Sequence, residues 1–377
     1  MKARVSKDEL LDKLANIQNI VEKKNTMPIL SHFLLNAGKK GSSIIATDIE
    51  TALREPIDVA VEKEGKICIP ARKMFEIVRE VDGELSFETV DEQWLKVRSG
   101  ASEFKLACLP HADFPAWPSS LGGGDVEELT IDAPVLLEMI EKTIYSAGES
   151  DTRYTLNGLL FHPKPENKSF TIVGTDGHRL AIILRQIDSK VKEEKKIIVP
   201  RKAVSELRRF LPAETGEGEE QPVKISIGEK HLLFTIGTIQ FLTRLIEGSY
   251  PNYENVIPQS NEKKMSIGRD VFTKVLRRVS VMSKERASAV RFDLENNKMT
   301  IFSSSPDLGE AKEEVPVDYA GDSVTLGFNA RYVLDVLNAM TTDKVVLEMQ
   351  DPLSPVLVKE DGNEDYKCVI MPMERKE

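Results

Sequence analysis

The chain has 377 residues and a mass of 42.2 kDa, which is enough for two or three domains of ordinary size. Hydrophobic residues make up 41% and charged residues 30% of it, a composition typical of globular domains and not of a disordered chain. No window approaches about 18 uninterrupted apolar residues, which excludes a membrane-spanning helix. The first residues, MKARVSKDELLDKL, lack the apolar segment of a secretory signal. We therefore expect a cytoplasmic protein.

One order of elements occurs three times along the chain. Each repeat opens with a segment in which apolar residues recur every three or four positions, the pattern of an amphipathic helix. Ser6 and Asp132 are suitable N-caps, and Pro134 stands where an early proline does not disturb a helix. The predicted first helices span residues 6–21, 132–148 and 268–283.

Strand-like runs rich in β-branched and aromatic residues follow each first helix, and a second helix follows the strands. The second helices begin near Pro70, Pro200 and Asn329, which are 130 and 129 residues apart. The predicted first strands lie at 28–37, 42–53, 154–162, 169–184, 289–295 and 298–305, and the second-helix segments at 68–81, 198–211 and 327–340. The predicted closing strands lie at 84–90, 94–100, 103–110, 223–228, 231–237, 239–246, 344–350, 355–361 and 366–373.

A repeat of about 130 residues is longer than a solenoid repeat, so each copy can bury a core of its own. The sequence therefore predicts an α+β protein with three tandem domains of the same helix-strand fold. We place the domains at 1–125, 126–250 and 251–377, because a glycine-rich segment and a polar, proline-punctuated segment fall near these boundaries.

The net charge of −10 argues against a uniformly basic surface, yet the basic residues gather on particular predicted helices. The segment 200–210 carries four basic residues against Glu206, and the segment 269–286 carries six against two acids. If the repeats surround an axis, these helices would form one basic zone suited to a phosphate backbone. No base-reading motif is present, so contact independent of base sequence is expected; the alternative is that each helix is an ordinary solvated face. The candidate residues from charge are Arg72, Lys73, Arg79, Arg201 and Lys202, with Arg208 and Arg209 in the same group.

Motifs for catalysis are missing from the sequence. There is no GxGxxG, no GxxxxGK[ST] and no HExxH, and the five histidines have no ligand spacing. Asp176 and His178 in GTDGHRL are the most site-like pair, but Asp-Gly between two apolar strands is typical of a hairpin turn. Cys68, Cys108 and Cys368 lie far apart in apolar runs and are predicted to be buried thiols. We predict no catalytic residue, no metal site and no cofactor.

The C-terminal word VIMPM, residues 369–373, is apolar where chain ends are usually polar. Burial in the third core explains part of it. Methionine beside proline also makes an adaptable rim for short apolar peptides.

Short segments along essentially the whole chain resemble those of one family, the bacterial DNA polymerase III beta subunit or sliding clamp. They include TMPILSHFLL from Thr26, ATDIE from Ala46, IPARKMFEI from Ile69, FKLACLPHADFP from Phe104, RYTLNGLLF from Arg153, GTDGHRLA from Gly174, VPRKAVSEL from Val199, LIEGSYPNYENVIP from Leu245 and VIMPM from Val369. The resemblance implies a head-to-tail homodimer, a closed six-domain ring that encircles duplex DNA and makes the replicative polymerase processive. It implies a subunit without catalytic activity.

The resemblance also implies two sets of site residues. The DNA-contacting positions would be Lys24, Arg72, Tyr154 and Thr155. The peptide-binding pocket would use Leu156, Thr175, Gly177, His178, Arg179, Leu180, Pro251, Val256, Val369, Ile370, Met371, Pro372 and Met373. This chain has Glu374 after VIMPM, where family members often have a basic residue, which bears on the charge that a peptide would prefer.

The partners implied are duplex DNA, the DNA polymerase III alpha subunit, the clamp loader, and other polymerases, ligase and mismatch repair proteins that carry short linear motifs. Two other interpretations remain open at this stage. One is an enzyme that acts on nucleic acid through Asp176 and His178, and the other is a repeat scaffold that binds no DNA.

Overall fold

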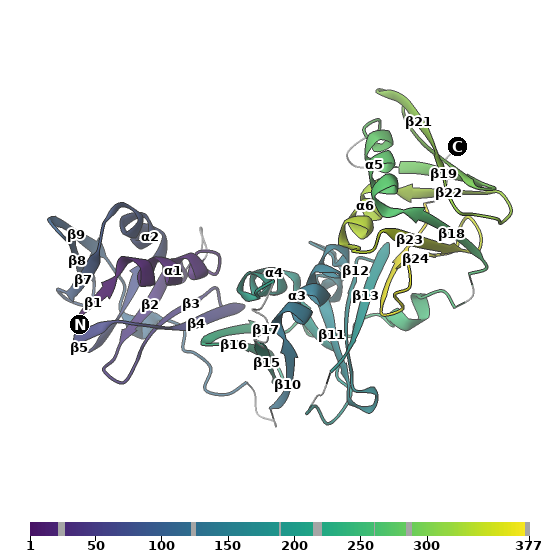
Figure 1. Cartoon of the computed structure of the whole chain (residues 1–377). Coiled ribbons are helices and arrows are strands. Elements are labelled where there is room, and N and C mark those ends of the chain that lie inside the picture. Colours follow the sequence, from purple (N-terminus) through teal and green to yellow (C-terminus); the bar gives the residue numbers. More distant parts are fainter. Residues whose placement is uncertain are drawn as a thin grey trace. The chain divides into compact units, whose positions relative to one another are not determined.

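The computed structural model describes residues 1–21, 27–121, 126–187, 190–213, 221–259, 261–283 and 289–373. The chain forms two compact units (Figure 1). Unit 1 comprises Met1–Pro134 and Ser205–Leu245, and unit 2 comprises Val135–Val204 and Ile246–Glu377. The strands of the middle repeat are therefore divided between the sheets of the two units.

Unit 1 contains a five-stranded and an eight-stranded antiparallel sheet. The first has the order β5-β1-β7-β8-β9, with β5 Ala60–Lys63, β1 Lys2–Ser6, β7 Glu84–Thr89, β8 Trp94–Ser99 and β9 Ser102–Ala107. The second has the order β10-β15-β16-β17-β4-β3-β2-β6, with β10 Glu127–Asp132, β15 Pro222–Ile227, β16 His231–Ile236, β17 Ile239–Arg244, β4 Thr51–Ile57, β3 Ser42–Thr47, β2 His32–Ala37 and β6 Gly65–Pro70.

Helices α1 (Lys7–Ile17) and α2 (Ala71–Glu80) pack against each other in unit 1. Ser6 is the N-cap of α1, since its hydroxyl accepts a hydrogen bond from the Glu9 backbone N–H at 3.2 Å. Leu10, Leu14 and Ile17 recur at helical spacing and are fully buried, so the amphipathic pattern seen in the sequence is the face that packs.

Unit 2 contains an eight-stranded and a four-stranded sheet. The larger has the order β14-β11-β12-β13-β25-β24-β23-β18, with β14 Ile197–Pro200, β11 Gly158–Lys164, β12 Ser169–Thr175, β13 Arg179–Gln186, β25 Tyr366–Ile370, β24 Val356–Glu360, β23 Lys344–Met349 and β18 Lys263–Gly268. The smaller has the order β21-β20-β19-β22, with β21 Gly309–Pro316, β20 Lys298–Ser305, β19 Ala289–Glu295 and β22 Val324–Asn329.

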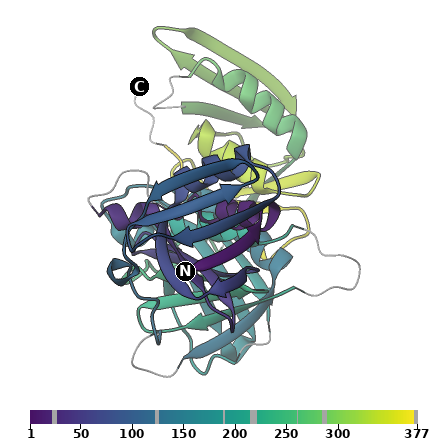
Figure 2. The ribbon, with the colours of Figure 1, turned by 90° about the vertical axis from the view of Figure 1, so that its left-hand side faces the viewer.

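Helix α5 (Arg269–Ser280) lies across one face of the four-stranded sheet and packs against α6 (Ala330–Ala339) (Figures 1 and 2). Phe272 of α5 meets Phe292 of β19 with ring centroids 5.6 Å apart, which identifies the buried face of that sheet. The remaining helices are α3 Ala133–Glu141 and α4 Arg201–Leu207, which cross the unit boundaries, and the short 3-10 turns η1 Pro28–Ser31, η2 His111–Asp113, η3 Ile144–Ser146, η4 Tyr154–Leu156, η5 Pro165–Asn167, η6 Arg208–Phe210 and η7 Tyr253–Val256.

All six predicted helices form, but the first helix of each repeat is shorter than the periodicity suggested. The segment predicted to be helical over 132–148 leaves the helix after Glu141, where the Thr143 hydroxyl donates back to the Met139 carbonyl at 2.7 Å and competes with the helical ladder. The sequence also missed the strands that precede the first helices, β1, β10 and β18, and the strands β5 and β21. These strands carry too few apolar residues to stand out.

Cys68, Cys108 and Cys368 are buried and free, as predicted. Burial raises the pKa of the Cys68 and Cys108 thiols to about 12, so both are neutral thiols at physiological pH. Within the described ranges no helix combines the length and apolarity needed to span a membrane, and no group of three or more potential metal ligands occurs.

Candidate functional site

The turn between β12 and β13 in unit 2 is a hairpin turn, as the Asp-Gly word predicted. Gly177 sits at its tip with φ +85°, a conformation that favours glycine. The Asp176 carboxylate accepts hydrogen bonds from the backbone N–H groups of His178 and Arg179, at 2.9 and 3.0 Å. The Thr175 hydroxyl accepts from the Gly177 N–H at 3.1 Å and donates to the Arg179 carbonyl at 2.6 Å. The turn is therefore held by its own side chains.

The C-terminal strand β25 lies directly beside this turn. It pairs with β13 in a register that places Val369 opposite Leu180, and the Met371 N–H donates to the His178 carbonyl at 2.9 Å. Val369 and Ile370 are each 1% exposed, whereas Met371 and Met373 are 36% and 40% exposed. The segment VIMPM thus divides into a buried strand end and two exposed methionines, so the burial predicted from the sequence holds for Val369 and Ile370, and the peptide-binding role of Met371 and Met373 stays a prediction.

An apolar floor continues from the turn toward the segment that links the second and third repeats. Leu180 and Val369 belong to one buried cluster with Leu160, Val173, Ile198, Tyr250, Tyr253 and Leu357. Pro251 is exposed next to Tyr250, and Val256, at the end of η7, is 40% exposed. Leu156 is almost fully buried. The structure therefore brings most of the predicted pocket residues into one region of unit 2, with exposed apolar side chains above a buried apolar base.

The Arg179 side chain is engaged by neighbouring groups of the protein itself. Its side chain is 8% exposed and contacts the Asp176 carboxylate at 3.1 Å, the Asp335 carboxylate at 2.6 Å and the Tyr145 carbonyl at 2.5 Å. The guanidinium also lies over the Tyr332 ring, 4.4 Å from its centroid. Arg179 therefore ties the turn to α6. Asp176 is used in the same way, as a turn acceptor and an ion-pair partner, and not as a free acid.

A polar cavity of about 630 Å³ lies beside the turn, and its lining includes residues that the sequence analysis assigned to no site. Tyr145, Asn329, Tyr332 and Asp335 line it together with Asp176, His178 and Arg179. The His178 ring stacks on Tyr332 with centroids 6.3 Å apart. Tyr332 and Asp335 are three positions apart and so share one face of α6. This spacing is a weak signal of a site, and nothing in the sequence indicates that the face lies beside the turn.

Charges around this cavity are balanced locally. Hydrogen bonds from Arg153 lower the pKa of the Asp151 carboxyl to about 2, so Asp151 stays ionised. Burial raises the pKa of the Tyr145 and Tyr332 hydroxyls, so both remain neutral. Among the residues that line the cavity, Asp151, Asp176, Arg179 and Asp335 take part in ion pairs, and the His178 ring stacks on Tyr332.

The candidate DNA-contacting residues occur in both units. On α2 of unit 1, Arg72 and Lys73 have side chains 81% and 59% exposed, and both contact Glu76. Arg79 is exposed on the same helix, with its guanidinium over the Phe75 ring.

In unit 2, Tyr154 is 77% exposed and Thr155 is partly buried next to it. Arg201 contacts the Ala147 carbonyl and the Glu149 carboxylate, both at 3.0 Å, while Lys202 is exposed. Lys24 and Glu374 lie outside the described residues, as do three charged residues of the predicted basic segment, Lys284, Glu285 and Arg286. The assignment of both residue sets stays a prediction.

Comparison with known proteins gives one consistent family. Family models for the N-terminal, central and C-terminal domains of the DNA polymerase III beta subunit match residues 1–118, 130–252 and 254–374. The chain is 34% identical over 371 residues to the beta sliding clamp of Pseudomonas putida, covering 98% of each chain. These names describe a clamp and not a catalytic subunit.

Solved structures agree with the sequence relatives. The chain is similar to the DNA polymerase III subunit beta of Pseudomonas aeruginosa, with a TM-score of 0.92 and 32% identity, covering 99% of this chain and 100% of that one. A second structure, a sliding clamp from Pseudomonas aeruginosa bound to griselimycin, matches with a TM-score of 0.90 and 32% identity over the whole of both chains. The three repeats are thus the three domains of the clamp fold. The chain belongs to the DNA polymerase III beta subunit family and is a sliding clamp, a processivity factor without catalytic activity.

Proposed function

We propose that two copies of the chain close head to tail into a six-domain ring around duplex DNA. On this proposal the groove beside the turn 175–179 tethers the DNA polymerase III alpha subunit, the clamp loader, and other polymerases, ligase and mismatch repair proteins through short linear motifs. The ring would work in the cytoplasm and contact DNA independently of base sequence.

A repeated pairing scheme carries the ring proposal. In the first repeat, β4 pairs with β17 of the next repeat, and in the second repeat β13 pairs with β25 of the next. The equivalent third strand of the third repeat, β21, is an edge strand, and so is β9, the last strand of the first repeat. Unpaired strand edges are templates for pairing with another chain. A second copy that places its β9 on β21 would continue the scheme and cover both of these edges. Head-to-tail interfaces of this kind form a ring when the rotation between copies closes.

The repeat also predicts the register of this pairing. Equivalent positions in the three last strands are fixed by backbone hydrogen bonds to the strand before each second helix, Leu109 to Cys68, Ile246 to Ile198 and Met373 to Gly327. Leu53 pairs with Phe241 in the first scheme, and Ala181 pairs with Cys368 in the second. The matching pair across two copies is Ala311 opposite Phe104.

This register places opposite charges face to face. Glu310 comes opposite Lys105, and Lys312 comes opposite Glu103, all on strands at the exposed edges of their sheets. Opposite-charge pairs across strands stabilise by roughly 0.2–1 kcal/mol each, and like charges destabilise. A one-residue shift would lose both pairs, so the charges support this register over its neighbours.

A charge swap tests the interface. Lys105→Glu should weaken the dimer, raising its dissociation constant roughly tenfold, because each ring contains two copies of the repulsive pair. The double variant Lys105→Glu with Glu310→Lys should restore the dimer, as measured by sedimentation velocity over a concentration series. Unchanged dimerisation in the single variant, or no recovery in the double, would refute this register.

Retention on DNA tests the topology. A ring loaded on a nicked circle should be released when the circle is linearised, and charge reversal at Arg72, Lys73, Arg201 and Lys202 should weaken binding and its salt dependence. Retention after linearisation with free ends would rule out encirclement. Failure to load on any circle would favour the scaffold interpretation.

Substitution of an exposed apolar side chain above the buried floor tests the groove. Val256→Asp places a carboxylate at such a position and should weaken binding of a polymerase-derived motif peptide at least about tenfold. Val271→Asp is the matched control, since Val271 is 50% exposed on α5 and away from the groove residues. Fluorescence anisotropy with both variants decides: equal affinities would remove Val256 from the peptide site.

A further inference from the structure

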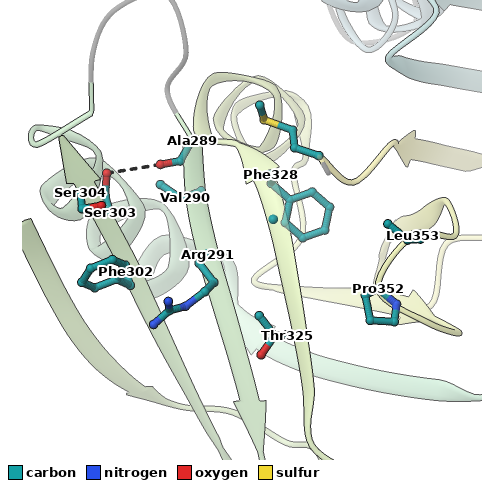
Figure 3. Close-up of a pocket in the computed structure, with 12 residues that line it drawn as sticks. Ala289, Val290, Arg291, Phe302, Ser303, Ser304, Thr325, Phe328, Pro352 and Leu353 are labelled. Carbon is teal, nitrogen blue, oxygen red and sulfur yellow. Dashed lines mark hydrogen bonds between the residues drawn. The ribbon is translucent and has the colours of Figure 1, made fainter. Parts of the chain in front are cut away.

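The residues predicted for the peptide groove lie on segments of unit 2 that are held in different ways. The chain end is held by its backbone, because the N–H groups of Met371 and Met373 each donate to a backbone carbonyl oxygen at 2.9 Å. Met373 there lines a pocket of about 640 Å³ beside the four-stranded sheet (Figure 3). The segment 247–258 carries Pro251 and Val256, and side chains fasten it to the larger sheet.

Three side-chain contacts join this segment to the neighbouring strands β11 and β12. The Tyr250 hydroxyl donates to a carbonyl oxygen of β12 at 3.3 Å. The Tyr253 hydroxyl lies 2.8 Å from Nδ1 of His162 on β11. The Lys164 ammonium donates to the Glu254 carboxylate at 2.6 Å, but this pair is partly exposed and contributes little to stability. The two tyrosine hydroxyls are therefore the contacts that fix the segment.

His162 is a buried group shared by two other elements. Its side chain is 1% exposed, and its Nε2 atom lies 2.5 Å from the Glu194 carboxylate. Glu194 belongs to the segment between β13 and β14, and its side chain is 55% exposed. The Tyr253 ring packs edge-on against the imidazole, with ring centroids 5.8 Å apart. The imidazole therefore connects a surface carboxylate to η7.

The partners assign the roles of the two ring nitrogens. The hydrogen bond with His162 lowers the pKa of Glu194, so this carboxylate is ionised and accepts from Nε2–H. Burial lowers the pKa of His162 below its ordinary value of 6.5 despite the contact with Glu194, so the ring is neutral at physiological pH. In the neutral ring Nδ1 accepts from the Tyr253 hydroxyl. Protonation would fill Nδ1, and the hydroxyl would lose its acceptor.

The charges that face the ring come from three elements. Lys164 lies on β11, Glu194 and Lys196 precede β14, and Glu254 follows Tyr253 in η7. The two carboxylates favour the protonated ring and the two lysines oppose it, so these charges offset each other. Burial and the tyrosine hydroxyl are left to keep the ring neutral.

Tyr253 carries the effect of this bond to the groove. Its ring is 3% exposed and packs in the buried cluster that contains Leu180 and Val369. Val256 is the last residue of the same four-residue turn, η7, and is 40% exposed. In so short a turn, the position of Val256 follows the position of Tyr253.

We propose that His162 is a positioning residue for motif binding. By accepting the Tyr253 hydroxyl and donating to Glu194, it fixes η7 and with it the exposed side of the groove at Val256. His162 is buried and touches no ligand, so it acts through Tyr253. This proposal rests on the groove proposal and adds to it a residue outside both predicted sets.

Removal of one hydroxyl tests the link on the full-length protein. Tyr253→Phe keeps the ring in the cluster and should weaken a polymerase-derived motif peptide about fivefold, the effect of one ordinary hydrogen bond, as measured by fluorescence anisotropy. Tyr319→Phe is the matched control, since Tyr319 is also buried, its hydroxyl donates to the Asp322 carbonyl at 2.6 Å, and it belongs to neither predicted set. This control should keep the affinity of the wild type.

A conservative change at the histidine should rescue binding. His162→Asn offers the Tyr253 hydroxyl an oxygen acceptor near the position of Nδ1 and should keep the peptide affinity within about twofold. His162→Leu offers none and should weaken the peptide as Tyr253→Phe does. Denaturant unfolding of both variants shows whether each is folded.

The titration of the His162 ring, followed by NMR, separates positioning from stability. Bound peptide holds the Tyr253 hydroxyl on Nδ1 and so favours the neutral ring, and by linkage it should lower the titration midpoint by roughly half a pH unit. The shift should vanish in Tyr253→Phe, where the hydroxyl is gone. His178, which belongs to the predicted groove, should respond to the peptide in both proteins and shows that the site is occupied.

Two results would overturn the positioning role while the groove proposal stands: equal peptide affinities of wild type and Tyr253→Phe, or a His162 midpoint that bound peptide leaves unchanged. Equal weakening by Tyr319→Phe and Tyr253→Phe would reduce the effect to general stability and refute the role as well. If no polymerase-derived peptide binds the wild type, the groove proposal itself fails, and the positioning role fails with it.

Discussion

The two eight-stranded sheets are built on the same plan but differ at equivalent turns. In unit 1 the turn Thr47–Thr51 repeats the hydrogen bonds of the turn Thr175–Arg179: the Thr47 hydroxyl donates to the Thr51 carbonyl at 2.8 Å, and the Asp48 carboxylate accepts from the Thr51 N–H at 2.6 Å. The Arg244 N–H donates to the Glu50 carbonyl at 2.8 Å, as the Met371 N–H does to His178. The backbone scheme is therefore common to both repeats.

The side chains on this common backbone differ between the two repeats. Ile49 holds φ +79° where the second repeat has Gly177, a strained conformation for a β-branched residue, and it is 52% exposed. Thr51 stands where the second repeat has Arg179. In the second turn the buried Arg179 guanidinium contacts Asp335 and Tyr332 of α6, a helix of the third repeat. The two turns thus share their backbone hydrogen bonds and differ at two positions, where glycine and arginine in the second repeat correspond to isoleucine and threonine in the first.

Buried glutamates show a second difference between the two sheets. Glu55 on β4 and Glu360 on β24 each have side chains 1% exposed. Glu360 accepts from Lys142 at 2.9 Å, the Thr341 N–H at 2.6 Å and Asn363 at 2.6 Å. Glu55 contacts Lys13 and Asn16, and among the described residues its Oε1 atom has no hydrogen-bond partner.

The partners decide the sign of the pKa shift. For Glu360 burial acts to raise the pKa, but the hydrogen bonds from Thr341, Lys142 and Asn363 outweigh it and the pKa is lowered. For Glu55 burial dominates over Lys13 and the pKa is raised. Two glutamates with equally buried side chains therefore have pKa values shifted in opposite directions.

Arg179→Gln should have the largest effect, because it removes the buried cation and leaves Asp176 and Asp335 without it. We expect a loss of about 3–5 kcal/mol in the free energy of unfolding and loss of motif-peptide binding. Arg153→Gln is the control, since Arg153 also contacts the turn but its side chain is 57% exposed. Denaturant unfolding monitored for both variants gives the comparison, and a similar small loss in each would show that Arg179 is not the tie.

Glu360→Gln should come next. It takes from Lys142, 4% exposed, its nearer and fully buried carboxylate, leaves only the longer contact with Glu138 at 3.5 Å, and should cost about 3 kcal/mol. Glu55→Gln should cost less than about 1 kcal/mol, because the carboxylate oxygen without a hydrogen-bond partner is already unfavourable. Thermal unfolding of the two variants would measure the difference. A larger loss at Glu55 would contradict the role given to its missing partner.

Lowering the pH should change the stability difference between wild type and Glu360→Gln in one direction and that between wild type and Glu55→Gln in the other. The pKa of Glu360 lies below its ordinary value of 4.5, so its stabilising contribution is present above that value and is lost as pH falls through the lowered pKa. The pKa of Glu55 lies above 4.5, so as pH falls the folded state binds a proton at Glu55 before the unfolded state does. The unfolding free energy of the wild type therefore rises relative to that of Glu55→Gln as pH falls. Between about pH 7 and pH 3.5, the two differences in unfolding free energy, wild type minus Glu360→Gln and wild type minus Glu55→Gln, should depend on pH with slopes of opposite sign. Slopes of the same sign would contradict the opposite pKa shifts of the two glutamates.

Exchange of the two turn-tip residues should have a smaller effect than Arg179→Gln or Glu360→Gln. Gly177→Ile should cost roughly 1–3 kcal/mol, since an L-residue is strained at φ +85° and its Cβ would come within 2.7 Å of the Arg153 guanidinium. Ile49→Gly relieves similar strain in unit 1 and should stabilise by up to about 1 kcal/mol, less the entropy that glycine adds to the unfolded chain. Equal destabilisation by both changes would mean that the isoleucine is held by packing and not strained.

The sequence by itself determined the threefold repeat, the six helices, the hairpin turn at Asp176–Gly177 and the buried cysteines. These features depend on periodicity and on hydrogen bonds between residues a few positions apart, as between Ser6 and Glu9 or Thr175 and Gly177, so local residue types suffice to predict them.

Only the tertiary structure decided which strands join across repeats and what each charged side chain touches. The pairing of β13 with β25, the contact of Arg179 with Asp335 and the hydrogen bond between Met373 and Gly327 all join residues far apart in the chain. β21, rich in charged residues, is a strand because β20 pairs with it, and its own pattern would not have predicted one. Such contacts are fixed by the packing of whole sheets, and no local pattern encodes which distant partner a side chain will meet.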